Sequence, residues 1–289
     1  MSRWMRVAVA AGATALVIAL GWSALGSPAP GRSALGSSAP GRSALTVTRA
    51  GDPDRLLPPV DGAFEYQLSG AFAPDSSARI VSRDRTDAPA PGVYDICYLN
   101  AFQTQPGADW PESLVLHNAD GERLADPDWP DEFILDTSTG DKRAAIARRI
   151  GVWIDGCAEA GSDAVEPDNL DSWQRSNGLL SEADDLALAR LIVAHAHARG
   201  LAVAQKNAAE LPEAAREKIG FDFAIAEECE VYAECGLYSA AYGGHVIEVE
   251  YTEEAFAAAC AARSGEISII LRDLDVVPRG AEGYRAETC

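Results

Sequence analysis

The feature that most constrains the fold of this chain is a series of short apolar runs, most of which end in a polar residue. Runs of this length, bounded by polar or turn residues, are typical of buried β-strands. Eight such runs occur, at residues 64–68, 78–81, 94–99, 164–165, 201–204, 221–226, 245–249 and 267–271. They predict eight strands.

Helical patterns separate the later runs. Residues 141–160 carry apolar side chains at helical spacing. Ser181 and Asp184 form the sequence pattern of a capping box, which predicts a helix that ends at Gly200. We expect two shorter helices over residues 212–219 and 253–263.

Strands that alternate with helices pair in parallel through right-handed crossovers. Eight such units predict an α/β fold of the (β/α)8 TIM-barrel type, with the active site at the carboxyl ends of the strands. The links after the first two strands, about 70–77 and 85–92, are short and rich in proline. Parallel neighbours usually need about a dozen residues to cross over, so we expect an irregular or trimmed barrel on the side of strands 1–3.

The first 55 residues have the composition of an export leader and a tether. Arg3 and Arg6 precede an apolar run that ends in small residues, which predicts a signal peptide or membrane anchor over 1–26. Two copies of one decapeptide, SALGSPAPGR and SALGSSAPGR, fill 23–42 and predict a flexible Gly/Pro/Ser/Ala linker over 27–55. The barrel domain is then 56–289. We favour a secreted or extracellular monomer, with membrane anchoring through the N-terminal segment as the alternative.

The barrel domain is strongly acidic. Residues 1–50 contain five Arg and no acidic residue, so the rest of the chain holds 19 basic and 44 acidic residues, a net charge of −25. This charge argues against nucleic acid as a partner, because a phosphate backbone attracts the opposite sign. It suits a cationic ligand, although acidity can also serve solubility alone.

Six cysteines, an even number in a chain with an export leader, suggest three disulfides. Six cysteines allow fifteen pairings. Proximity in the predicted barrel favours Cys97–Cys157, Cys229–Cys235 and Cys260–Cys289. No CxxC or HxxxH spacing occurs, so we expect neither a metal site nor a cofactor.

Acidic residues gather at the ends of two predicted strands. Glu166 and Asp168 end the fourth strand, and Glu227 and Glu228 end the sixth. Two carboxyl groups across a cleft are what glycoside cleavage requires, because one attacks or activates water and the other protonates the leaving oxygen. A solvated acidic loop or a cation site is the alternative interpretation, since barrels also use acidic pairs to bind metals.

A set of segments that follow one another in order resembles glycoside hydrolase family 114, the endo-α-1,4-polygalactosaminidases, over about residues 60–275. These segments are YQLSG (66–70), ICYLNA (96–101), WPDEFILD (129–136), VEPDNLD (165–171), KNA (206–208), FDFAIAEEC (221–229), YAEC (232–235) and VEY (249–251). The resemblance implies a TIM-type barrel that hydrolyses α-1,4-linked galactosamine polymers with retention. It implies Asp168 as nucleophile and Glu227 as general acid/base, with Glu166 and Glu228 as the second choices.

Further polar residues at predicted strand ends are candidates for contact with a cationic amino-sugar polysaccharide. They are Gln67, Tyr98, Asn100, Glu166, Asn169, Asp171, Lys206, Asn207, Glu228, Glu250 and Tyr251. Ordinary packing or hydrogen bonding at the barrel rim is the alternative role for each.

The chain also departs from the family pattern. Ala226 stands where the family tends to have Asn, Gln205 replaces an apolar residue, and the region between strands 2 and 3 is short. Two competing hypotheses stand beside this interpretation, and Ala226 and the trimmed barrel support the first of them. One is a non-catalytic carbohydrate-binding barrel at the cell surface, and the other is a cation-dependent hydrolase that uses Glu166, Asp168 and Asp171 as oxygen ligands.

Overall fold

The computed structural model describes residues 55–211 and 218–289. The expected leader, nearly all of the expected linker and residues 212–217 of one expected helix lie outside the described residues. Within the described ranges, no helix combines the length and the apolar character that a membrane crossing needs.

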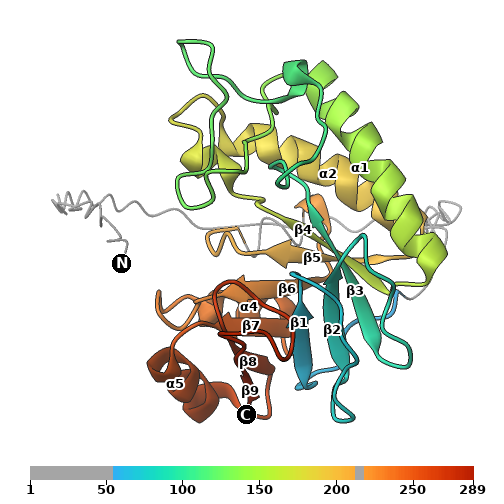
Figure 1. The fold of residues 1–289 in the computed structure, drawn as a ribbon, viewed down its shortest axis with the longest axis vertical. Helices are drawn as coiled ribbons and strands as arrows, with labels where there is room; N and C mark the ends of the chain where they lie inside the picture. Colours follow the sequence, from blue (N-terminus) through green and yellow to red (C-terminus); the bar gives the residue numbers. More distant parts are fainter. Residues whose placement is uncertain (1–54, 212–217) are drawn as a thin grey trace, which may run out of the picture. The chain divides into compact units, whose positions relative to one another are not determined.

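Eight parallel strands pair in chain order and form the barrel wall (Figure 1). Each of the eight apolar runs overlaps one of them. They are β1 (Phe64–Gln67), β2 (Ile80–Asp84), β3 (Tyr94–Asn100), β4 (Ala164–Asp168), β5 (Ala202–Lys206), β6 (Phe223–Glu227), β7 (Val246–Glu250) and β8 (Ser268–Arg272). The fold class predicted from the sequence is therefore confirmed.

Two long helices cover one side of the barrel. Helix α1 (Gly140–Ala160) begins after Thr139, whose side chain accepts a hydrogen bond from the Lys142 amide, and α2 (Glu182–Ala198) begins with the expected capping box. The two helices pack side by side near β3, β4 and β5 (Figure 1). Helix α5 (Glu253–Arg263) was also expected, whereas α4 (Cys235–Tyr242) was not.

The side of the barrel formed by the first strands is trimmed, as expected. Residues 68–79 and 85–93 connect β1 to β2 and β2 to β3 without a helix. By contrast, β3 is followed by a long connection over residues 101–139, which we call the β3–α1 loop. It contains a single turn of 3-10 helix, η1 (Glu112–Leu114), and a few isolated bridges. Gln105 of this loop donates to Asp84 at the carboxyl end of β2 at 2.6 Å.

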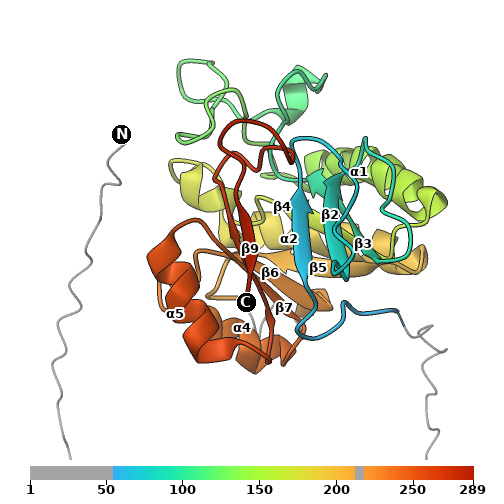
Figure 2. The same ribbon diagram turned by 60° about the horizontal axis from the view of Figure 1, so that its bottom comes forward.

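A ninth strand, β9 (Ala286–Thr288), pairs antiparallel with β8 and was not predicted (Figure 2). The hydrogen-bonded order therefore runs from β1 to β9 and does not close from β8 onto β1. The buried guanidinium of Arg272 on β8 donates instead to the Tyr66 carbonyl on β1. This contact joins the two ends of the parallel sheet.

Alternation along the strands produces two hydrophobic layers. One side of each strand packs into the barrel interior, where Ile96, Ala164, Ala204 and Ile225 are buried. The other side packs outward under the helices with residues such as Val165. Because successive side chains point to opposite faces, the same alternation decides which strand-end residues reach the barrel mouth.

Three disulfides tie the barrel together. Cys97 on β3 pairs with Cys157 on α1, Cys229 pairs with Cys235, and Cys260 on α5 pairs with the C-terminal Cys289. These are the three pairs expected from the sequence. The last of them holds β9 against β8, because Cys289 directly follows that strand.

Replacing both Cys260 and Cys289 by Ser tests this role. The bridge spans 29 residues, and its loss should destabilise the protein by about 2–4 kcal/mol through freedom gained in the unfolded chain. Calorimetry should show a melting temperature roughly 5–15 °C lower than that of the parent protein. An unchanged melting temperature would show that β9 does not depend on the bridge.

Candidate active site

The ammonium group of Lys206 is the centre of the site. Lys206 ends β5, and its side chain is only 2% exposed. Its Nζ lies 3.1 Å from Glu166 Oε1, 3.2 Å from Asp168 Oδ1 and 3.4 Å from Glu227 Oε2. All four residues occupy inward positions at the carboxyl ends of β4, β5 and β6, so one buried cation faces three carboxylates.

Asp168 combines partial exposure with strong stabilisation of its charge. Tyr98 donates to Oδ2 at 2.6 Å and the Asn169 amide donates to Oδ1 at 2.8 Å. Asn169 adopts a left-handed backbone with φ of 64°. Burial by itself raises the pKa of Asp168, but the Lys206 charge and these hydrogen bonds hold it below its usual value. Asp168 is therefore a carboxylate at neutral pH.

Glu166 lies beneath this layer and is fully buried. Tyr66 donates to Oε1 and Ser82 donates to Oε2, both at 2.6 Å. Burial raises the pKa of Glu166 despite the opposing effect of Lys206. Glu166 was expected to contact substrate or to act as the second-choice nucleophile, but its position suits neither role, because both oxygens are engaged and no solvent reaches it.

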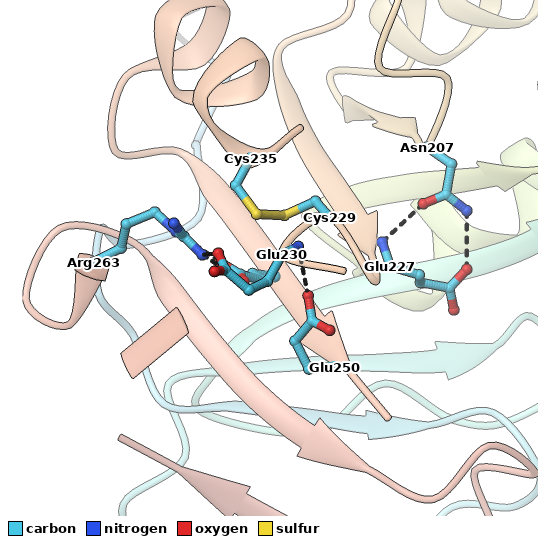
Figure 3. Close-up of a disulfide and its surroundings, with 8 residues drawn as sticks. Asn207, Glu227, Cys229, Glu230, Cys235, Glu250 and Arg263 are labelled. Atoms are coloured by element: carbon cyan, nitrogen blue, oxygen red, sulfur yellow. Dashed lines mark hydrogen bonds and ion pairs between the residues drawn. A yellow bond between two sulfur atoms is a disulfide. The ribbon is translucent and has the colours of Figure 1, made fainter. Parts of the chain in front are cut away.

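Glu227 is 24% exposed at its side chain and is held by two neighbours. Asn207 donates from Nδ2 to Oε2 at 2.9 Å and accepts the Glu227 amide at 2.8 Å, and these two bonds are drawn in Figure 3. Tyr251 donates to the other oxygen, Oε1. The positive φ of Asn207, 49°, is an uncommon backbone conformation for a residue other than Gly.

The contacts with Lys206 limit how far apart the two exposed carboxylates can be. Asp168 Oδ1 and Glu227 Oε2 lie 3.2 Å and 3.4 Å from the same nitrogen. The two oxygens cannot be farther apart than the sum of these distances. That upper limit only touches the range of about 6.5–9.5 Å typical of inverting glycosidases, and it includes the roughly 5–5.5 Å of retaining ones.

A second network borders Asp168 on the side of the β3–α1 loop. Asn100, at the end of β3, donates to Glu132 Oε2 at 2.7 Å and accepts from Asn169 Nδ2 at 2.9 Å. Asp171 is paired with Arg175 at 3.0 Å. The cation site proposed from Glu166, Asp168 and Asp171 does not fit this geometry, because the protein supplies its own cations, Lys206 and Arg175, to these carboxylates.

Two expected site residues point away from the barrel mouth, because they occupy outward positions on their strands. Gln67 is buried and accepts hydrogen bonds from Arg83 Nε at 3.0 Å and from the Phe72 amide at 3.1 Å. Glu250 is buried in the outer layer, where it accepts the Glu230 amide at 2.9 Å beside the Cys229–Cys235 disulfide (Figure 3).

Glu248, Glu250, Cys229 and Cys235 form a tight group in this outer layer, within 4.8 Å of one another. Both sulfurs are bonded in the disulfide, and Arg263 pairs with Glu248 at 2.9 Å. This group is therefore a support beneath the loop that follows Glu227. Glu228 begins that loop with a φ of 55°.

Ala226 also faces the outer layer, where it is 1% exposed. Its side chain does not enter the barrel mouth, so this departure from the family pattern does not alter the site. It gives no support to the non-catalytic alternative.

Sequence reasoning missed three residues of the site: Tyr66, Ser82 and Glu132. Alternation would have found Tyr66, because it shares the inward side of β1 with Phe64. Ser82 is likewise the inward residue two positions after Ile80. Glu132 lies in a loop without periodicity, and only its place in the family-like segment WPDEFILD (129–136) could have drawn attention to it.

A pair of partly exposed carboxylates at the carboxyl ends of barrel strands, on either side of a positive charge, defines a glycoside hydrolase type of site. Comparison with known proteins agrees. The model of glycoside-hydrolase family GH114 matches residues 45–289. The chain belongs to this family and is a glycoside hydrolase.

Solved structures that resemble the chain include those of Ega3 and PelA. Ega3 of Aspergillus fumigatus, in complex with galactosamine, is 23% identical, with a TM-score of 0.64 over 81% of this chain and 98% of that one. The glycoside hydrolase domain of PelA from Pseudomonas aeruginosa is 17% identical, with a TM-score of 0.49 over 77% and 98%. At this identity the likeness to Ega3 concerns the fold. No curated protein matches the chain.

The buried carboxyl of Glu250 predicts a pH-dependent stability. Burial, with added repulsion from Glu248 and Glu228, raises the pKa of Glu250 to about 7. Because an unfolded Glu titrates near 4.3, the folded state holds its proton longer, and stability falls as pH rises through this interval. Relative to Glu250→Gln, the parent protein should lose on the order of 1–3 kcal/mol of unfolding free energy between pH 5 and pH 8.

Urea denaturation at the two pH values measures this difference. Glu254→Gln, which removes an exposed carboxyl from α5, is the matched control and should keep the pH dependence of the parent. Parallel pH curves for the parent and Glu250→Gln would contradict the prediction.

Proposed function

We propose that this protein is a secreted, retaining endo-glycosidase that hydrolyses α-1,4-linked galactosamine polymers. The observation that carries the proposal is the Asp168–Lys206–Glu227 arrangement, in which two partly exposed carboxylates approach one buried ammonium group. Family membership supports the reaction class.

Asp168 is the nucleophile in this proposal. Its lowered pKa keeps it ionised, and Tyr98 fixes one oxygen while the carboxylate stays 17% exposed at its side chain. Attack of a carboxylate oxygen on the anomeric carbon forms a glycosyl ester and expels the leaving oxygen. The burial of Glu166 favours Asp168 for this step.

Glu227 is the general acid and base. It protonates the leaving oxygen as the ester forms, and then accepts a proton from the water that cleaves the ester. Asp168 loses its negative charge in the same step in which Glu227 gains one. Because both oxygens face Lys206, the charge around the ammonium group stays constant through the reaction, which keeps the electrostatic cost of each step low.

The substrate class is proposed from charge and from likeness. The chain beyond residue 50 has a net charge of −25, which attracts a polymer of protonated amines. Ega3, whose fold is similar, was solved with galactosamine. Three disulfides fit the oxidising environment that secretion implies.

Two substitutions test the assignment. Asp168→Asn and Glu227→Gln should each lower the release of reducing ends from polygalactosamine by roughly 10²–10⁴-fold, because each removes a group that acts on the reacting atoms. Asp141→Asn, which removes an exposed carboxyl from α1, should leave the rate unchanged.

The configuration of the first product tests retention. Proton NMR during cleavage by the parent enzyme should show the α-anomer before mutarotation. Full activity in both site variants would reject the two residues, and a β-anomer formed first would reject the retaining mechanism.

A further inference from the structure

We infer that Glu132 binds the ammonium group on C2 of the sugar unit that Asp168 attacks, and that it selects free amino sugars over N-acetylated ones. The inference rests on the proposed function and adds to it a residue that decides the acetylation preference.

Glu132 is held beside the nucleophile by a short chain of contacts. Asn100 donates to its Oε2 at 2.7 Å, and Asn100 pairs in register with Asp168 between β3 and β4. The backbone is fixed as well, because the Glu132 amide donates to the Trp129 carbonyl at 2.8 Å and its carbonyl accepts the Asp126 amide at 2.9 Å. The carboxylate therefore has a defined place at the edge of the site.

Glu132 differs from its acidic neighbours in forming no ion pair, although the charge of Arg175 acts on it from farther away. Glu166 and Glu227 share Lys206, while Asp126 and Asp171 share Arg175. Among the described residues, no Lys, Arg or His forms an ion pair with Glu132. Burial raises the pKa of Glu132 to about 7; the charges of Asp168 and Asp126 add to the rise, while the Asn100 hydrogen bond and the charge of Arg175 oppose it. A half-buried carboxylate among like charges gains most from a cation that arrives with the ligand.

The chemistry of the substrate supplies that cation at a suitable place. The amino group of galactosamine is on C2, the atom next to the anomeric carbon that Asp168 attacks. An ammonium group there reaches the surroundings of the nucleophile whenever the sugar is placed for reaction. An N-acetyl group is neutral, and it would leave the Glu132 carboxylate partly desolvated without a cation.

The test compares two substrates and two variants. Glu132→Gln should lower kcat/KM roughly 10- to 100-fold on fully deacetylated galactosamine oligomers, as expected for loss of a charged hydrogen bond. On N-acetylated oligomers the change should be less than about threefold, because the neutral group gains nothing from the charge. Asp131→Asn, which removes the adjacent exposed carboxyl, is the matched control and should change neither value.

The pH profile gives a second readout. Because Glu132 must be ionised to bind an ammonium group, kcat/KM of the parent on the free amine should fall as pH drops below about 7. Glu132→Gln should lose this limb, and Glu132→Asp should restore part of the preference for the amine. Thermal unfolding confirms that the variants are folded.

The outcomes separate this inference from the proposed function. The role of Glu132 would be overturned if Glu132→Gln lowered kcat/KM equally on both substrates or on neither. The same loss in Asp131→Asn would also overturn it. In each of these cases, cleavage of the oligomers by the parent enzyme would leave the proposed function intact. If the parent enzyme cleaves neither the free-amine oligomer nor the N-acetylated one, both the proposed function and the role of Glu132 are overturned.

Discussion

The structure of this site depends on one buried ammonium group, that of Lys206, which faces three carboxylates from two other strands. Burying a charged group costs free energy, and proteins tolerate a buried charge only when it is paired and hydrogen-bonded. Tyr66 and Ser82 complete the bonding of Glu166, Tyr98 completes that of Asp168, and Asn207 and Tyr251 complete that of Glu227. The polar layer at the barrel mouth is thus a single connected network.

The same network sets the roles of the carboxylates. Glu166 is sealed beneath the layer, so it supports the charge of Lys206 without meeting a ligand. Asp168 and Glu227 remain partly exposed, and their shared contact with the ammonium group limits how far apart their facing oxygens can lie. Outside the barrel, the Cys229–Cys235 disulfide and the Glu230–Arg263 pair hold the loop that follows Glu227 (Figure 3).

The sequence predicts much of this fold because its strands and helices carry clear periodic signals. All eight parallel strands, α1, α2 and α5 follow from apolar patterns and caps. Strand β9 is three residues long and partly exposed, and it pairs only where Cys289 is tied to α5, so no local pattern marks it. Helix α4 begins at the second cysteine of the Cys229–Cys235 disulfide and has 8 residues, too few to show a clear helical period.

The sequence predicted that Asp168, Lys206 and Glu227 lie together at the barrel mouth, because position at a strand end decides that placement. Gln67 and Glu250 were misplaced because nearness to a strand end does not tell which face a side chain takes, whereas alternation does. The position of Glu132 beside the site could not be predicted, because it depends on how the β3–α1 loop folds back onto Asn100.

The most direct test of the account is to trap the glycosyl ester. In Glu227→Gln, an α-galactosaminide with an activated leaving group should form the ester without acid assistance, and the ester should persist because no base activates water. Mass spectrometry of the digested protein should find one sugar on the peptide that contains Asp168, with fragmentation placing it on Asp168. A sugar on Glu166, or no adduct while product accumulates, would contradict the assignment on which the mechanism rests.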